Sequence, residues 1–380
     1  MRHILSFLIL SILLAGCAAA APDASSATIP PTTAETEAPA TVATEPPDPM
    51  AMLLEAMTVE EKVGQLFLLR CSEYTAMDDI AAYHPGGFIL FGQDFNGETP
   101  DSFRSKMAAY QAASPIALLI AVDEEGGAVC RVSSNPAFRH SRFPSPREAC
   151  AAGGMERVLS VESEKAALLH SLGINVNMGP VCDITTGFGA FMHARSLGEP
   201  PEATGQFIAS AVQIYGNHKL GSVLKHFPGY GNNGDTHTGM VRDERSLEEL
   251  ESADLIPFAA GITAGCDAIL VSHNIIAALD EEYPATLSPA VHDYLRGTMG
   301  FAGVIVTDDL VMQAITDVYG PEEAAVLAVL AGNDLLCSSE YTIQYPAVLE
   351  AVQSGRISMD QLNQSVMRIL EWKRELGLIF

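Results

Sequence analysis

Three ionisable residues in one short stretch of the chain, His226, Asp235 and His237, could carry out proton transfer or bind a metal. An aspartate two residues before a histidine can orient the imidazole as a general acid and base near neutral pH. A metal site built from all three residues is the alternative, but their spacing matches no common zinc pattern. The stretch therefore predicts acid–base chemistry and no metal, although each histidine taken alone is also compatible with an ordinary polar loop.

A second candidate for chemistry is the pair Asp308 and Asp309, which directly follows an apolar run. An acid in this position can accept hydrogen bonds from the free N–H groups of the next helix, and we expect Asp309 to be such a cap. Asp308 would then end the strand and point into the mouth of the fold. A carboxylate that faces an acid–base group can attack an anomeric carbon and form a covalent glycosyl-enzyme, which water then releases.

The segment Gly229-Tyr230-Gly231-Asn232-Asn233-Gly234 has the glycine spacing of a dinucleotide-binding loop. Such a loop must open a helix whose N-terminus holds the pyrophosphate. The residues that follow, from Asp235 to Gly239, predict a loop and not the start of a helix. We therefore reject nucleotide binding and expect no cofactor.

The elements that would position these residues are short apolar runs that alternate with helical stretches, as is typical of a parallel α/β fold. Eight runs predict strands, at residues 66–70, 87–91, 117–122, 175–178, 222–226, 268–272, 303–307 and 334–337. Helices are predicted between and after them, including 155–172, 202–215, 247–264, 322–331 and 359–376. Eight such units favour a single (β/α)8 barrel of the TIM type, with an open doubly wound sheet as the alternative.

Polar clusters follow most of the predicted strands from the third onward. They are Asp123-Glu124-Glu125-Gly126-Gly127, Gly179-Pro180-Val181-Cys182-Asp183, Lys225-His226-Phe227-Pro228-Gly229, Ser272-His273-Asn274 and Thr307-Asp308-Asp309. In a barrel, the carboxyl ends of all strands meet on one face, and active sites lie on that face. Because unpaired charges at the end of a buried strand are costly, the convergence of these clusters predicts a functional site.

The N-terminal region predicts export and attachment to a lipid. Residues 4–14 are an apolar run too short to span a bilayer, and the run ends in Leu14-Ala15-Gly16-Cys17, which resembles a bacterial lipobox. We expect a lipoprotein signal peptide at residues 1–16, lipidation of Cys17, and a disordered tether rich in Pro, Thr, Ala and Glu at residues 17–49. An ordinary signal peptide with a chance cysteine is the alternative. A single catalytic domain would occupy residues 50–380 on the extracytoplasmic side of the membrane.

The charge of the chain restricts its partners. A formal net charge of −26 argues against nucleic acid and against electrostatic docking on anionic lipid, so attachment to the membrane would depend on the N-terminal lipid alone. The cysteines after Cys17 are scattered, show no metal-ligand spacing and lie mostly in apolar runs. They predict buried thiols, with disulfides among them as the alternative.

Taken together, the motifs resemble glycoside hydrolase family three, in its single-domain β-N-acetylglucosaminidase branch. The similarity runs from about Thr58 to the C-terminus. The motifs are Gly86-Gly87-Phe88-Ile89-Leu90-Phe91, Asp123-x-Glu125-Gly126-Gly127-x-Val129-x-Arg131, Arg195-Ser196-Leu197-Gly198, Lys225-His226-Phe227-Pro228-Gly229, Pro284-Ala285-Thr286-Leu287-Ser288 and Gly300-Phe301-x-Gly303-Val304-Ile305-x-Thr307-Asp308.

The resemblance implies a retaining β-N-acetylhexosaminidase, in which Asp308 is the nucleophile and His237, paired with Asp235, is the acid/base. It also implies that the hydroxyls of the terminal sugar are held by Asp123, Arg131, Arg195, Lys225 and His226. Related β-glucosidases take a glutamate acid/base from a second domain. Here the similarity ends with the last barrel helix, so we expect the acid/base to come from the barrel.

The chain departs from the family pattern at the loop that carries His237. Tyr230 stands where the family usually has His or Leu, and one residue fewer separates Gly231 from Asp235. Because the loop is rich in glycine and asparagine, we expect it to reach the site despite being shorter.

Other activities are compatible with the same residues. A histidine acid/base adds no second anion beside the nucleophile, so phosphate could replace water as the acceptor in a β-N-acetylglucosaminide or β-glucoside phosphorylase. A broad β-glycosidase and a non-catalytic glycan-binding lipoprotein are further alternatives, but only an enzyme requires both Asp308 and His237. The candidate substrates are peptidoglycan fragments and chitin-type or host-glycan oligosaccharides.

Overall fold

A computed structural model describes residues 48–380 of the protein. The expected signal peptide, Cys17 and nearly all of the expected tether lie outside these residues. Among the helices that are described, none combines the length and apolar character needed to cross a bilayer.

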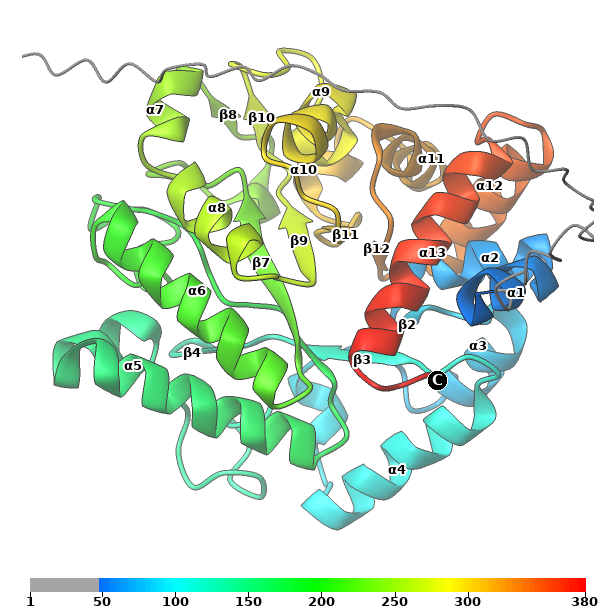
Figure 1. Cartoon of the computed structure of the whole chain (residues 1–380), viewed down its shortest axis with the longest axis horizontal. Coiled ribbons are helices and arrows are strands. Elements are labelled where there is room, and N and C mark those ends of the chain that lie inside the picture. The colour runs from blue at the N-terminus through cyan, green and yellow to red at the C-terminus, as the bar shows by residue number, and fades with distance from the viewer. Residues whose placement is uncertain (1–47) are drawn as a thin grey trace, which may run out of the picture. The chain divides into compact units, whose positions relative to one another are not determined.

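Eight parallel strands form the centre of the molecule (Figure 1). Their order is β11-β9-β7-β6-β3-β2-β1-β12. The two edge strands meet at a bridge between Val306 and Leu335, where the N–H of Thr307 donates to the Leu335 carbonyl at 3.0 Å. The strands are β1 (Phe67–Arg70), β2 (Gly87–Leu90), β3 (Leu119–Val122), β6 (Val176–Asn177), β7 (Gly221–Phe227), β9 (Ala268–Val271), β11 (Val304–Thr307) and β12 (Leu336–Ser338). The predicted barrel and its eight strands are confirmed, and the open sheet is not.

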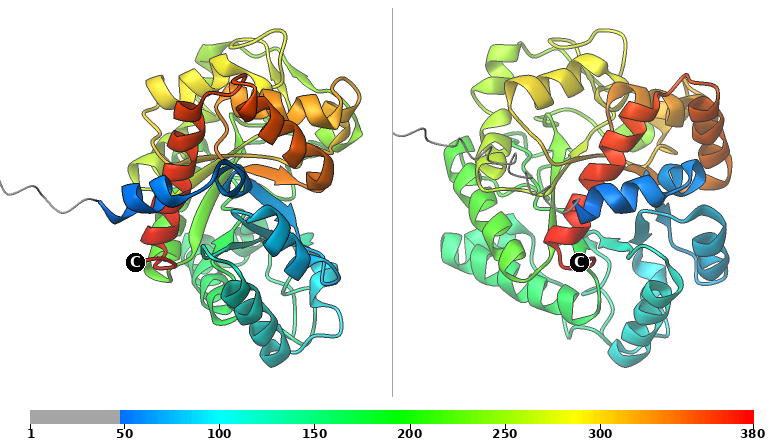
Figure 2. Two further views of the ribbon diagram at one scale, coloured as in Figure 1. Left: turned by 90° about the vertical axis from the view of Figure 1, so that its right-hand side faces the viewer. Right: turned by 45° about the vertical axis from the view of Figure 1, so that its right-hand side comes forward.

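Helices cover the outside of the barrel (Figures 1 and 2). Because both faces of each strand are therefore buried, the strands can be continuous apolar runs. The helices are α1 (Pro49–Ala56), α2 (Val59–Gln65), α3 (Ala76–Tyr83), α4 (Pro100–Ala113), α5 (Pro146–Ser171), α6 (Pro201–Asn217), α7 (Leu247–Glu251), α8 (Leu255–Thr263), α9 (Pro289–Asp293), α10 (Gln313–Thr316), α11 (Pro321–Ala331), α12 (Tyr341–Gln353) and α13 (Met359–Glu375).

Two predicted helices differ from the observed ones. The helix predicted at 247–264 is two helices, α7 and α8, and the one predicted at 155–172 begins earlier, at Pro146. Ser145 caps this earlier start by accepting a hydrogen bond from the N–H of Glu148. The helix is interrupted at Gly153 and Gly154, and Gly154 adopts a φ of 64°, which glycine tolerates because it has no Cβ.

The amino ends of the strands are closed by α13. Trp372 packs against Gly221 at the start of β7, where a Cβ would lie only 2.8 Å from the Cζ2 atom of the tryptophan. The neighbouring Lys373 is buried, and its Nζ donates to the side-chain oxygen of Gln65 at 2.6 Å. Since this end of the barrel is filled, a cavity for a ligand must open at the carboxyl end.

Four short strands lie in the loops at the carboxyl end. β4 (Glu124–Gly126) pairs with β5 (Val129–Cys130), and β8 (Arg242–Asp243) pairs with β10 (Ile275–Ile276). The glycine-rich segment 229–234 leads into a single 3-10 turn, η2 (Thr236–Thr238), and not into an α-helix. The prediction that a loop follows these glycines is therefore confirmed.

Candidate active site

A cavity of about 600 Å³ lies at the carboxyl ends of the strands. Its wall is partly apolar, with Phe91, Phe191 and Leu270 among the lining residues. Every side chain predicted for the site also lines it: Asp123, Arg131, Arg195, Lys225, His226, Asp235, His237 and Asp308. The structure thus brings together residues that the chain supplies from many strand ends, and the predicted convergence on one face is confirmed.

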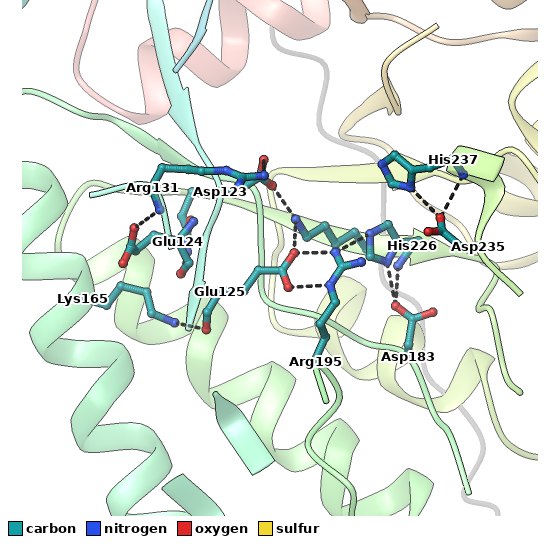
Figure 3. A network of polar contacts seen from close by, with 12 residues as sticks. Asp123, Glu124, Glu125, Arg131, Lys165, Asp183, Arg195, His226, Asp235 and His237 are labelled. Carbon is teal, nitrogen blue, oxygen red and sulfur yellow. Dashed lines mark hydrogen bonds and ion pairs between the residues drawn. The ribbon is translucent and has the colours of Figure 1, made fainter. Parts of the chain in front are cut away.

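Glu125 lies at the centre of the charged residues in this cavity (Figure 3). Its carboxylate accepts hydrogen bonds from Arg195, at 2.8 Å from Nε and 2.6 Å from one terminal nitrogen, and it lies 2.6 Å from Nζ of Lys225. Burial opposes its ionisation, but the charges of Arg195 and Lys225 outweigh burial and hold the pKa of Glu125 well below its usual range. Glu125 was not predicted as a site residue, because its importance depends on two cations that are distant in sequence.

Asp123 occupies the more exposed side of the same cluster. Nζ of Lys225 donates to one of its carboxylate oxygens at 2.6 Å, and the guanidinium of Arg131 lies 3.7 Å from the other. The guanidinium of Arg131 also lies over the ring of Phe91, 5.4 Å from its centroid. Donors and acceptors that surround one space in this way can bind the hydroxyl groups of a sugar.

His226 follows Lys225 on β7, and its two ring nitrogens have different partners. Nδ1 lies 2.8 Å from the carboxylate of Asp183, and Nε2 lies 3.1 Å from a terminal nitrogen of Arg195. Because a guanidinium only donates, Nε2 must accept, which places the ring proton on Nδ1. Both ring nitrogens of His226 are thereby engaged, so neither is free for the alternative metal site. Within residues 48–380, no group of three potential metal ligands is found.

Asp308 directly follows β11, and its carboxylate accepts a hydrogen bond from the N–H of Asp309 at 2.9 Å. Burial would raise its pKa, but electrostatic interactions with His273 and His226 and the hydrogen bond from the N–H of Asp309 outweigh burial. They hold the pKa of Asp308 below its ordinary value. An ionised carboxylate that lines the cavity is the form that can act as a nucleophile.

The prediction that Asp309 caps the next helix is wrong. That helix, α10, begins only at Gln313, and its N-cap is Met312. Asp309 instead accepts hydrogen bonds from the N–H groups of Val311 and Ser339, both at 3.3 Å, and from the Ser339 hydroxyl. Asp309 therefore ties the loop after β11 to the loop after β12.

Asp235 and His237 form the predicted pair at the edge of the cavity. Nδ1 of His237 lies 2.6 Å from Oδ1 of Asp235, and the same oxygen accepts from the backbone N–H of His237 at 2.9 Å. Because an ionised carboxylate only accepts, Nδ1 carries the proton, and Nε2 is left without a partner among the described residues. The His237 side chain is 58% exposed. The shorter loop thus reaches the site, as expected.

Glu124 holds the segment that carries Arg131, and it was also not predicted. Its buried carboxylate accepts hydrogen bonds from three successive N–H groups, at 2.9 Å from Arg131, 2.8 Å from Val132 and 3.2 Å from Ser133. The only signal in the sequence is its place between Asp123 and Glu125, which does not distinguish a structural carboxylate from one that binds a ligand.

The cysteines of residues 48–380 are all free thiols. Five of them are buried and Cys150 is half-buried. The predicted buried thiols are thus confirmed apart from Cys150, and the alternative of disulfides is not borne out among these residues.

One protein family and several known proteins resemble this chain over most of its length. The model of the glycosyl hydrolase family 3 N-terminal domain matches residues 58–372. Beta-hexosaminidase LpqI of Mycobacterium tuberculosis is 30% identical over 330 residues, which cover 83% of each chain. A beta-hexosaminidase of Stenotrophomonas maltophilia (strain R551-3) is 35% identical over 284 residues, 72% of this chain and 81% of that protein.

The solved structures that resemble the chain agree with these matches. A glycoside hydrolase family 3 beta-N-acetylglucosaminidase from Paenibacillus sp. str. FPU-7 superposes with a TM-score of 0.79 at 34% identity. The alignment covers 85% of this chain but 63% of that one, so the chain spans less than two thirds of the Paenibacillus protein. The structure of M tuberculosis LpqI aligns with a TM-score of 0.77 at 28% identity, over 85% of this chain and 96% of that one.

Proposed function

The chain belongs to glycoside hydrolase family three, and from this premise we propose that it is a retaining β-N-acetylhexosaminidase. It would release β-linked N-acetylglucosamine from the non-reducing end of a glycan. The observation that carries the proposal is that Asp308, Asp235 and His237 line one cavity. A nucleophile and a proton donor therefore have access to the same bound sugar. The relatives named beta-hexosaminidase support N-acetylglucosamine as that sugar.

In the first step, the Asp308 carboxylate attacks the anomeric carbon while the bond to the leaving oxygen breaks. His237 enters this step protonated on both ring nitrogens, with Nδ1–H held by Asp235, and Nε2 donates its proton to that oxygen, which leaves the neutral imidazole. The product is an ester between Asp308 and the sugar, with inverted configuration at the anomeric carbon.

In the second step, Nε2 of His237 takes a proton from water as the water oxygen attacks the anomeric carbon. The bond to Asp308 breaks, which restores the carboxylate, and the second inversion gives net retention. Asp123, Arg131, Arg195, Lys225 and His226 would hold the sugar hydroxyls through both steps, since all five line the cavity.

The function is tested by assaying the full-length chain in detergent on aryl β-N-acetylglucosaminide and aryl β-glucoside, each with and without phosphate. Preference for the N-acetylglucosaminide without dependence on phosphate, and a β-anomer as the first product by NMR, would support the proposal. A sugar phosphate formed only with phosphate present would identify a phosphorylase. Absence of turnover on both substrates would favour the non-catalytic glycan-binding lipoprotein.

We also propose that the chain is a lipoprotein anchored through Cys17 on the extracytoplasmic side of the membrane. The proposal is supported by the apolar run at residues 4–14 and by the small residues before Cys17. An extracytoplasmic location makes peptidoglycan fragments the first natural substrates to test. Replacement of Cys17 by Ala should move the protein from the membrane fraction to the soluble fraction, and retention in the membrane would contradict the anchor.

A further inference from the structure

The loop that carries the Asp235–His237 pair is closed on itself by two hydroxyl groups. The hydroxyl of Tyr230 lies 2.6 Å from the hydroxyl of Thr236. Both residues are buried, with exposures of 1% and 0%. Tyr230 lies at the start of the loop and Thr236 directly precedes His237, so this hydrogen bond joins the base of the loop to the neighbour of the proposed acid/base.

Tyr230 is itself held from several sides. Its backbone N–H donates to Asp183 at 2.8 Å, and its ring contacts His226 and Phe191, with centroid distances of 5.3 Å and 5.5 Å. Phe191 in turn lies against the imidazole of His237, at 6.1 Å between centroids. Burial and the negative charge of Asp308 raise the pKa of Tyr230, so its hydroxyl stays protonated. The tyrosine is thus a fixed point beside the proposed acid/base.

A second contact fixes the middle of the same loop. The side-chain oxygen of Asn232 accepts from the N–H of Thr186 at 3.0 Å, the N–H of Gly187 at 2.8 Å and the hydroxyl of Thr185 at 3.0 Å. Its amide nitrogen donates to the Thr186 hydroxyl at 3.0 Å. These four hydrogen bonds attach the loop after β7 to the loop after β6, and the turn η2 also packs against α10, which follows Asp308.

We propose that Tyr230 and Thr236 are positioning residues, which form a latch that places Nε2 of His237 for proton transfer. The inference rests on the proposed function, because it concerns the same acid/base. The latch lies in the loop at which this chain departs from the family pattern, with a tyrosine at position 230 and one residue fewer. A general acid must lie within hydrogen-bonding distance of the oxygen that it protonates. In this loop, the latch sets the position of His237 and hence that distance. The exposed imidazole of His237 has Asp235 as its direct polar partner, which orients the ring but does not fix the loop.

The latch is tested with Tyr230→Phe, Thr236→Val and the double variant, each in the full-length chain. Each change removes one hydroxyl and keeps the shape of the side chain. Turnover is measured on a series of aryl β-N-acetylglucosaminides whose phenols differ in pKa. We expect each single variant to lose on the order of tenfold in kcat/KM on the poorest leaving group and progressively less on better ones, because only poor leaving groups need protonation. The double variant should lose no more than the worse single variant, since both changes break one hydrogen bond.

Tyr345→Phe is the matched control. Tyr345 lies on α12, is also buried and is not among the residues that line the cavity. Its hydroxyl donates to the carbonyl of Glu60 at 3.2 Å. This variant should keep the wild-type dependence on the leaving group. Losses that are equal for all leaving groups, or effects of the two changes that add in the double variant, would overturn the latch.

A readout that does not require turnover separates failure of the latch from failure of the proposed activity. Amide hydrogen exchange over residues 231–239 should become faster in Tyr230→Phe and in Thr236→Val but stay unchanged in Tyr345→Phe. Unchanged exchange in the first two variants would overturn the latch even if the enzyme is active. Faster exchange in a protein that shows no glycosidase activity would keep the latch and reject the function.

Discussion

Arg195 binds the carboxylate of Glu125 through two hydrogen bonds, 2.8 Å and 2.6 Å long, while only 1% of the glutamate side chain is exposed. Two-point binding fixes the plane of the guanidinium as well as its position. Lys225 shares the same carboxylate. Glu125 therefore sets the positions of two of the cations proposed to bind the sugar.

Replacement of Glu125 by Gln should lower kcat/KM by at least about tenfold and also lower the melting temperature. Breaking a buried ion pair on one side leaves its partner uncompensated, at a cost of roughly 3–5 kcal/mol. Glu164→Gln is the matched control, because Glu164 is 51% exposed and its pair with Arg139 should contribute less than about 1 kcal/mol. Wild-type kcat/KM in Glu125→Gln would contradict the organising role.

Replacement of Asp308 by Ala should remove nearly all activity, by roughly 10⁴-fold or more, because the variant lacks the proposed nucleophile. The assay is turnover of an aryl β-N-acetylglucosaminide, with circular dichroism to verify that the variant is folded. A folded variant with wild-type turnover would refute Asp308 as the nucleophile.

Replacement of His237 by Ala should slow poor leaving groups much more than activated aryl groups, because activated phenolates depart without a proton. Azide can attack the glycosyl-enzyme without a general base, so it should restore turnover of an activated substrate and yield a glycosyl azide. Equal losses across leaving groups, together with no effect of azide, would argue against His237 as the acid/base.

The buried Lys373 should make the stability of the protein depend on pH. Burial lowers the pKa of Lys373 to about 7 in the folded protein, whereas an exposed lysine has a pKa of about 10.4. Between these values the unfolded chain binds a proton that the folded chain does not, so the free energy of unfolding should increase as pH rises from about 7 toward 10. Below that window the lysine is protonated in both states and its contribution no longer changes.

Replacement of Lys373 by Met should therefore flatten this pH dependence and stabilise the protein most toward the low end of the window, by on the order of a few kcal/mol. The measurement is urea unfolding at two values of pH within the window. Lys219→Met is the control, since Lys219 is at the surface and makes only a long contact, 3.4 Å, with the carbonyl of Glu375. An unchanged slope in Lys373→Met would show that the buried amine does not lose its proton on folding.

The positions of the strands and of the cavity residues were predictable because both follow from local patterns. Apolar runs give the strands, and polar residues directly after them, such as Asp123 and Asp308, must lie on the face where parallel strands end. That face is common to all strands, so residues far apart in sequence could be assigned to one site without knowledge of their contacts.

The parts that were not predictable depend on partners distant in sequence. Asp309 has the local signature of a helix cap, but Ser339 on another loop competes for its carboxylate. Glu125 and Glu124 are neighbours of the same type. Glu125 faces two cations in the cavity, whereas Glu124 accepts hydrogen bonds from backbone N–H groups. The hydroxyl of Tyr230 finds Thr236 only because the loop turns back on itself.

The closure of the barrel by α13 has a consequence for the order of events during synthesis. Trp372 and Lys373 belong to the most C-terminal helix, while their partners Gly221 and Gln65 lie far earlier in the chain. On a ribosome, the strands would emerge before the residues that cover their amino ends. A nascent chain would therefore expose the floor of the barrel until α13 has been synthesised. A premature stop before Met359 would leave an aggregation-prone, protease-sensitive product and not a smaller working enzyme.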